Sequence, residues 1–172
     1  MSNLDTKKQS TLTVVHEFNA PKELVFEAFG NAEALNEWWG PAESQNSVIT
    51  LDFRPGGIFH YRMNYNGKIT YGRFVFGRIE PFDLLEFTNA FSDEHANITK
   101  APFDIPIPME ISYQLNFSEL NGRTTLTLTG EPVNASNEEI ESFRSINLNV
   151  QQGFGATFDK LAVYLKTKRK NT

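Results

Sequence analysis

Two amide side chains, Asn147 and Gln151, interrupt an otherwise apolar stripe near the end of the sequence. The other members of the stripe recur at helical spacing and are Ile140, Phe143, Val150, Phe154, Phe158, Leu161 and Leu165. A buried amide without a hydrogen-bond partner costs about 1–3 kcal/mol, so a sealed core rarely holds two of them one helical turn apart. Either the amides bind polar groups of the sheet or tyrosine hydroxyls, or they face a cavity that holds water or a ligand.

The three histidines show no spacing that would bind a metal ion. His16 lies on the apolar face of a predicted strand, where a hydrogen-bonded core histidine is expected. His60 is expected to be solvated or at a sheet edge, and His95 lies in a long loop. The sequence has no G-x-S-x-G or P-loop motif and no cysteine nucleophile. We predict no catalytic residue, metal or cofactor, and a cyclase or hydrolase would have only Tyr61, Tyr113 or His16 as inward candidates.

Two further pairs of residues invite a functional interpretation. Asp52 and Arg54 are close together at a predicted turn, where an exposed ion pair is more common than a catalytic pair. Trp38 and Trp39 are adjacent at the end of a short predicted helix, so their indoles point in different directions. Trp39 is expected either to border a cavity or only to pack.

The elements that position these residues follow from the hydrophobic period along the chain. A period of two predicts seven strands, at residues 11–18, 47–53, 58–63, 68–79, 85–91, 111–118 and 124–129. Helical spacing predicts short helices at residues 21–29 and 32–38, and one long helix from Ser136 or Asn137 to about Leu165. One long helix covers only one face of such a sheet. The predicted fold is α+β, a curved seven-stranded antiparallel sheet wrapped around the long C-terminal helix.

Residues 92–109 are the one long segment without a clear period, with prolines at positions 102, 106 and 108. A long loop of this kind in a compact domain is often a lid or a binding loop, and disorder is the competing explanation. We expect this loop to gate the entry to a pocket between the sheet and the long helix.

Length and charge narrow the class of protein. The chain of 172 residues fits one domain, and we expect a flexible N-terminal segment (1–10), a single domain (11–166) and a basic tail (167–172). A net charge of −5 argues against nucleic-acid binding. No segment has the roughly 18 uninterrupted apolar residues that a membrane span needs. The lack of cysteine fits a cytoplasmic location, and a homodimer is left open.

Aromatic residues are abundant, with fifteen phenylalanines, five tyrosines and two tryptophans. They either fill a ring-rich core or line a ligand cavity, because ligand pockets are mostly apolar with few polar anchors. The residues expected to line such a pocket are inward-facing rings, the two amides and one methionine. They are Trp39, Phe59, Tyr61, Phe87, Phe91, Met109, Tyr113, Phe143, Asn147, Gln151, Phe154 and Phe158.

Several short motifs follow one another along residues 11–165. They are Phe18-Asn19-Ala20-Pro21, Trp38-Trp39-Gly40-Pro41, Asp52-Phe53-Arg54-Pro55-Gly56-Gly57-Ile58-Phe59, Ile79-Glu80-Pro81, Leu85-Glu86-Phe87-Thr88-Asn89-Ala90-Phe91 and Phe158-Asp159-Lys160-Leu161. In this order the sequence resembles the helix-grip (SRPBCC) superfamily of lipid-transfer START domains, polyketide cyclases and the birch pollen allergen. More narrowly, it is similar to the branch named for the activator of the heat-shock-protein ATPase, at the level of that activator's C-terminal domain.

The resemblance implies a helix-grip fold, on which related proteins bind, transfer or cyclise ligands or assist chaperones. Our leading hypothesis is the binding of a small hydrophobic or amphipathic ligand, such as a lipid, between the sheet and the C-terminal helix. The alternatives are a cyclase or hydrolase that uses the same cavity, and an interaction module that contacts a chaperone. The resemblance also implies that the activator has a separate N-terminal docking domain, whereas about ten residues precede the first strand here.

Overall fold

The computed structural model describes residues 11–170, with side chains described as far as Lys168. Seven antiparallel strands form one sheet in the order β1-β7-β6-β5-β4-β3-β2. They are β1 (Leu12–Phe18), β2 (Ser44–Leu51), β3 (Ile58–Tyr65), β4 (Lys68–Glu80), β5 (Leu84–Ser92), β6 (Ile111–Leu120) and β7 (Arg123–Pro132). The helices are α2 (Lys22–Glu27), α3 (Ala32–Trp38), α4 (Asn137–Ser145) and α5 (Asn147–Lys170). The predicted fold, with two short helices after the first strand, is confirmed.

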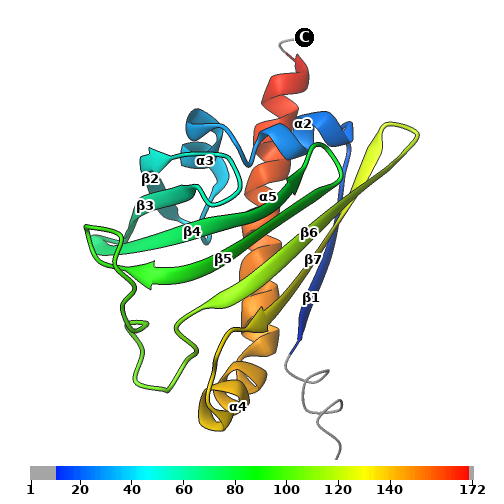
Figure 1. Ribbon diagram of the computed structural model, residues 1–172. Coiled ribbons are helices and arrows are strands. Elements are labelled where there is room, and N and C mark those ends of the chain that lie inside the picture. Colours follow the sequence, from blue (N-terminus) through cyan, green and yellow to red (C-terminus); the bar gives the residue numbers. More distant parts are fainter. Residues whose placement is uncertain (1–10, 171–172) are drawn as a thin grey trace, which may run out of the picture.

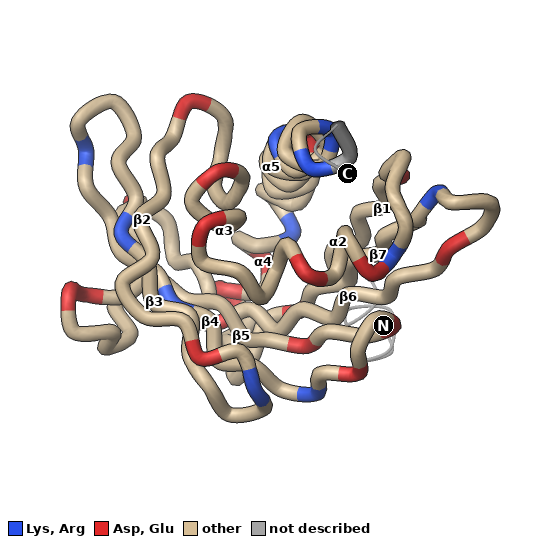
Figure 2. Tube along the Cα trace, turned by 90° about the horizontal axis from the view of Figure 1, so that it is seen from above, with Lys and Arg blue, Asp and Glu red and all other residues tan. Residues whose placement is uncertain are grey.

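The helices cover one face of the sheet. In Figure 1, α5 crosses the sheet with α2 and α3 near one end of it and α4 at the other end. From above, strands β3–β6 form a curved layer and α5 lies on one side of it (Figure 2). Helix α5 packs mainly against α3 and β1. One face of the sheet is thus enclosed, and the opposite face is open to solvent.

Alternating residues of the strands build the enclosed face. The register places Phe59 opposite Phe74, and Phe87 opposite Tyr113. All four side chains are buried, and each buried ring of this size stabilises the fold by about 1.5–3 kcal/mol. The intervening residues, such as Ser112 in β6, face outward and are half-buried. The alternation in the sequence therefore predicts the inner face correctly.

The prediction of one continuous C-terminal helix is wrong. Helix α4 begins with a capping box, in which the Ser136 hydroxyl accepts from the Glu139 amide and the Glu139 carboxylate accepts from the Ser136 amide. It ends at Ile146, whose φ of −101° and ψ of 5° are not helical, and α5 begins at the next residue. The apolar spacing continues through this break, so hydrophobic periodicity alone does not reveal it.

The expected N-terminal segment, residues 1–10, lies outside the described residues. The expected basic tail, residues 167–172, begins inside α5, which continues to Lys170. No helix in the described range 11–170 is long and apolar enough to cross a membrane.

Candidate functional site

Helix α5 covers the sheet unevenly along its length. Among residues 147–168 its buried residues are Thr157, Phe158, Leu161 and Leu165. We call residues 147–156, which precede them, the first half of the helix and the remainder the second half. Between Asn147 and Ala156 no side chain is fully buried. A methyl group added at Gly153 or Gly155 would meet no atom within 4 Å beyond the helix's own backbone. The first half of α5 is therefore loosely packed, and the second half is sealed onto the core.

Two tyrosines of the inner face each lie over a glycine of the neighbouring strand. Tyr61 in β3 is directly opposite Gly72 in β4, and Tyr113 in β6 is opposite Gly130 in β7. A Cβ atom at Gly72 would lie 2.4 Å from the Tyr61 hydroxyl oxygen, and one at Gly130 would lie 2.6 Å from the Tyr113 ring. Glycine at both positions thus allows the two rings to lie against the sheet.

The ring of Phe154 links the loosely packed half of α5 to this tyrosine pair. Its centroid is 5.3 Å from the Tyr113 ring and 6.4 Å from the Trp39 ring. The Trp39 and Tyr61 rings are 6.0 Å apart. Trp39, Tyr61, Tyr113 and Phe154 therefore form one cluster between α5 and the sheet, which we call the tyrosine cluster.

The tyrosine cluster holds polar atoms inside an apolar setting. Asn89 Nδ2 donates to the Tyr61 hydroxyl at 3.2 Å and to the Arg73 carbonyl at 3.1 Å. The indole Nε1 of Trp39 lies near the Tyr61 hydroxyl but is buried without a hydrogen-bond partner in the described part of the chain. The Tyr113 hydroxyl makes no hydrogen bond among residues 11–170, but it is not one of the fully buried unpaired atoms. Buried polar groups are normally paired, so Trp39 Nε1 requires an explanation.

Burial sets the chemistry of the two tyrosines. It raises the pKa of Tyr61, an effect partly opposed by Asn89 and Trp39, and it raises the pKa of Tyr113 together with the proximity of Tyr61. Both hydroxyls consequently stay protonated at neutral pH. They can donate hydrogen bonds, but they are poorly suited to act as general bases.

The two amides in the stripe have protein partners. Gln151 Nε2 donates to Asn147 Oδ1 at 2.6 Å, and Asn147 Nδ2 lies 3.5 Å from the Thr11 carbonyl oxygen. Both side chains are only partly buried. Hydrogen bonding within the protein, one of the two alternatives left by the sequence, therefore accounts for part of their polarity, and they lie in the loosely packed half of α5.

The structure brings most of the expected pocket residues into one continuous set of ring contacts. This set comprises Trp39, Phe59, Tyr61, Phe87, Tyr113, Phe154 and Phe158. Phe91 instead contacts Phe103 of the 92–109 loop, with ring centroids 5.9 Å apart. Met109 is 40% exposed, and Phe143 is buried in α4.

Sequence reasoning missed Asn89 and the two glycines. Asn89 lies two positions from both Phe87 and Phe91 and shares the inward face of β5 with them. The period of two in the sequence therefore indicates that Asn89 faces inward. The glycines carry no such signal, because their role depends on which residue lies opposite in the next strand.

Two hollows in the described part of the surface lie away from the tyrosine cluster. One is on the outer face of the sheet and is bordered by Glu86, Ser112 and Gln114. The other lies between α3 and α5, bordered by Glu37 and Lys160 among others. Beneath the first half of α5, the Phe154 ring itself occupies the position over the tyrosines.

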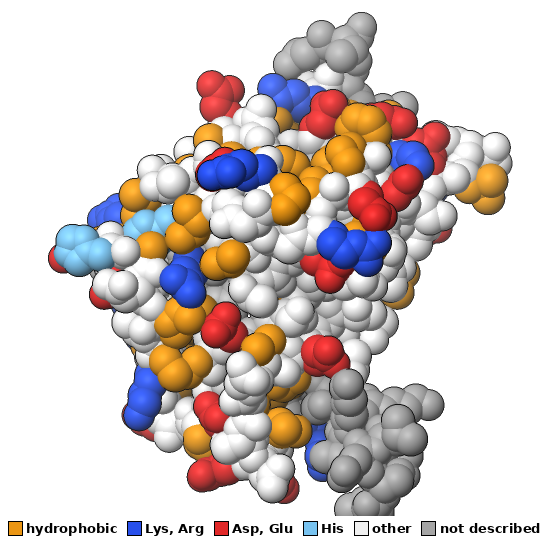
Figure 3. All heavy atoms as spheres, in the orientation of Figure 1, with side chains coloured by type: hydrophobic (Ala, Val, Ile, Leu, Met, Phe, Trp, Pro, Cys, Tyr) orange, Lys and Arg blue, Asp and Glu red, His pale blue; other side chains and the backbone are white. Residues whose placement is uncertain are grey.

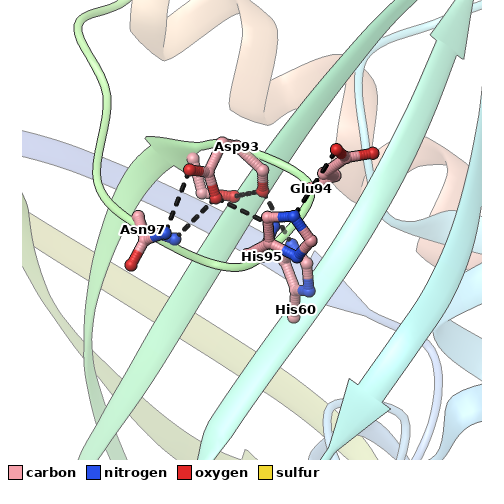
Figure 4. Close-up of polar contacts among 6 residues, drawn as sticks. His60, Asp93, Glu94, His95 and Asn97 are labelled. Carbon is pink, nitrogen blue, oxygen red and sulfur yellow. Dashed lines mark hydrogen bonds and ion pairs between the residues drawn. The ribbon is translucent and has the colours of Figure 1, made fainter.

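A second polar group lies on the outer face, where residues 93–97 fold over His60 (Figure 4). Asp93 Oδ1 accepts from the amides of His95 at 2.8 Å and Asn97 at 2.9 Å, and the Asp93 carbonyl oxygen is 3.1 Å from His60 Nε2. Hydrogen bonds from Asn97 lower the pKa of Asp93. His60 is 4% exposed, so the prediction of a solvated or edge histidine is wrong because this loop covers it. Within residues 11–170, no three His, Cys, Asp or Glu side chains are grouped to hold a metal ion.

Two other sequence candidates have structural roles. Arg54 Nε is 2.7 Å from Asp52 Oδ2 in an exposed ion pair at the turn, as predicted. His16 Nε2 is 3.2 Å from Asp159 Oδ1 and joins β1 to α5. Neither pair makes a hydrogen bond or ion pair with the tyrosine cluster in the described part of the chain, and His16 packs on Phe18 and Phe158.

The outer face of the sheet carries apolar side chains interspersed with charged and polar ones (Figure 3). Val15 in β1 is 61% exposed and Ile69 in β4 is 37% exposed. Strands β7, β6 and β5 lie between β1 and β4 in the sheet, so these two exposed side chains are not neighbours.

The curved sheet closed by a long C-terminal helix, with a ring-lined inner face, defines the helix-grip class of proteins. A family model described as "Activator of Hsp90 ATPase homolog 1-like protein" matches residues 19–166, and the chain belongs to this family. The resemblance drawn from the sequence motifs is confirmed. No curated protein matches the chain in sequence.

Several solved structures are similar to this chain. Protein Ms6760 from Mycobacterium smegmatis aligns over 92% of this chain and 92% of its own, with 25% identity and a TM-score of 0.74. A protein from Arthrobacter aurescens aligns over 97% of this chain and 90% of its own, with 23% identity and a TM-score of 0.76. The AHSA1 protein from Silicibacter pomeroyi aligns over 92% and 99%, with 19% identity and a TM-score of 0.69. The last two show the fold alone.

Proposed function

We propose that this protein binds a small amphipathic molecule between the inner face of the sheet and the first half of α5. The observation that carries the proposal is the contrast at the tyrosine cluster. The indole N–H of Trp39 is buried without a partner among the described residues, its ring and the Tyr113 ring both contact Phe154, and residues 147–156 of the helix above them are not fully buried. Apolar walls with a few polar anchors are typical of ligand sites, and proteins of this fold commonly bind hydrophobic ligands.

Phe154 is the side chain that a ligand displaces in this proposal. It is only partly buried, and it lies between Gly153 and Gly155 in the helix. Each glycine in a helix interior costs about 1 kcal/mol relative to alanine, and no packing contact requires either one. The pair therefore weakens α5 locally, where Phe154 must move to expose the tyrosines.

Two observations favour binding over the alternatives. General acid–base catalysis at this site works best with a group that titrates near neutral pH, and the raised pKa values of Tyr61 and Tyr113 make both tyrosines unsuitable as bases. The third candidate, His16, lies instead at 3.2 Å from Asp159. A chaperone-contact module predicts a continuous apolar patch on the outer face, and the exposed apolar side chains there are interspersed with charged ones (Figure 3).

The test uses the two indole N–H signals in NMR spectra of the isotope-labelled protein. The chain has only two tryptophans, and Trp38 Nε1 already donates to the Ala28 carbonyl at 3.0 Å inside the core. During titration with fatty acids, flavonoids and aromatic polyketides, we expect a saturable shift of the Trp39 signal while the Trp38 signal stays in place. If no compound moves the Trp39 signal, or if both signals move together, the site is not where we place it.

A further inference from the structure

The polar atoms of the tyrosine cluster are hydrogen-bond donors that have a hydrogen left to give. A backbone carbonyl only accepts, so the Arg73 carbonyl fixes the amide of Asn89 with its nitrogen inward. That nitrogen also faces the Tyr61 hydroxyl, so the Tyr61 oxygen accepts and its own hydrogen remains for another acceptor.

Trp39 and Tyr113 add to this set. An indole nitrogen is a donor only, and Trp39 Nε1 is buried without a partner in the described residues. The Tyr113 hydroxyl is also unpaired within residues 11–170. Two of these donors, Trp39 Nε1 and the Tyr113 hydroxyl, belong to rings that contact Phe154. A buried donor without a partner, such as Trp39 Nε1, is costly, and a ligand acceptor would remove that cost.

Asn89, Trp39, burial and the tyrosines themselves shift the pKa of the two tyrosines, and no charged side chain does. The cation beside the following segment, Lys160 Nζ, is bound to the carbonyl oxygens of Gly40 and Pro41 at 3.3 Å. A carboxylate ligand at the two tyrosines would therefore be buried without a direct cationic partner, which is strongly unfavourable. An amine would bring additional donors to a site that already lacks acceptors.

We propose that the ligand carries an uncharged carbonyl group, whose oxygen accepts hydrogen bonds from Tyr113 and from Tyr61 or Trp39. This inference rests on the proposed function, because it concerns the same site. A carbonyl oxygen has two lone pairs and can pair with two of these donors at once. A site built to hydrogen-bond a ligand group discriminates strongly against the analogue that lacks the group.

A matched series of naphthalene derivatives tests the inference by equilibrium dialysis. Naphthyl methyl ketone, ethylnaphthalene, naphthoic acid and naphthylmethylamine share one ring system and differ only in the substituent. We expect the ketone to bind at least about tenfold more tightly than the other three, since one paired donor contributes about that factor. The ketone alone should move the Trp39 indole proton in the direction of a stronger hydrogen bond.

The Tyr113→Phe variant removes one donor, and the Tyr164→Phe variant is the matched control. Tyr164 borders the separate hollow between α3 and α5. We expect Tyr113→Phe to weaken ketone binding about tenfold and leave ethylnaphthalene binding unchanged, and Tyr164→Phe to change neither.

The outcomes separate the two proposals. Equal binding of the ketone and ethylnaphthalene, with a shift of Trp39, overturns the carbonyl inference and leaves the proposed function standing. Tightest binding of naphthoic acid overturns the inference in the same way. If no compound of the series binds or moves Trp39, the inference fails, and the wider panel of fatty acids, flavonoids and polyketides then decides the proposed function.

Discussion

Phe154 and Phe158 lie one helical turn apart on α5, with ring centroids 5.8 Å apart, and have different surroundings. Phe158 is 1% exposed and packs against Phe18 and His16 of β1. Phe154 is only partly buried and covers the tyrosine cluster. One half of the helix thus closes the core, and the other half lies over the tyrosine cluster with the unpaired indole N–H of Trp39. The difference shows how a single helix can be firmly packed at one end and loosely packed at the other.

Truncation of the two rings should separate the halves most clearly. Phe158→Ala should reduce the free energy of unfolding by about 3–5 kcal/mol, as for a fully buried phenylalanine. Phe154→Ala should cost about 1 kcal/mol or less, because its ring is only partly buried. Urea denaturation of both variants measures the difference, and similar losses would show that the two halves are packed alike.

Alkaline pH tests whether water reaches the buried Tyr61 and Tyr113 side chains beneath the first half of α5. Tyr61 and Tyr113 have raised pKa values in the folded protein, whereas in the unfolded chain they ionise near pH 10, about the ordinary value. Their contribution to stability is therefore fully present below about pH 10 and falls as the pH rises toward the folded pKa, by about 1.4 kcal/mol per tyrosine and pH unit. Tyrosinate absorbance, followed together with circular dichroism, should show both ionising only on unfolding. Ionisation of all five tyrosines near pH 10 in the folded protein would mean that water fills the site.

Gly72→Ala should disturb the packing of Tyr61 against the sheet. The new Cβ would lie 2.4 Å from the Tyr61 hydroxyl, and overpacking of this kind costs about 1–3 kcal/mol. Gly77→Ala, in the same strand, is the control, because its nearest neighbour would be 3.4 Å away. In a Tyr61→Leu background the cost of Gly72→Ala should largely disappear in denaturation experiments. An unchanged cost there would mean that Tyr61 is not the residue that requires the glycine.

The smallest expected effect is a gain in stability. Gly153→Ala and Gly155→Ala should each raise the free energy of unfolding by about 0.5–1 kcal/mol, since alanine is the better helix former and the space around both positions is open. Thermal unfolding measures the gain. A loss of stability at either position would contradict the loose packing of this half of α5.

The fold was predictable from the sequence because alternation and helical spacing carry most of its information. The inward rings of β3, β5 and β6 follow a period of two, and the turns at Asn66-Gly67 and Asn121-Gly122 take the positive φ values that such turns need. The break at Ile146 could not be found in this way, because the apolar stripe continues across it.

The site was only partly predictable, because it depends on contacts between distant segments. Trp39, Tyr61 and Tyr113 were expected to face a pocket, and the rings do meet. Their pairing with Gly72 depends on strand register, which no local pattern specifies. The burial of His60 depends on Asp93, thirty-three positions away, and a loop without a period gives no sign of where it will fold.

The pairing of each tyrosine ring with a glycine in the next strand also suggests how the position of the tyrosine hydroxyl could be changed. Tyr61 and Gly72 face each other across two adjacent strands, so exchanging the two residues would keep the total volume while carrying the hydroxyl about 4.8 Å sideways, one strand spacing. The residue at one position of each tyrosine–glycine pair thus limits the size of the residue at the other. Under the proposed function, ligand preference is expected to diversify by such paired exchanges rather than by single substitutions.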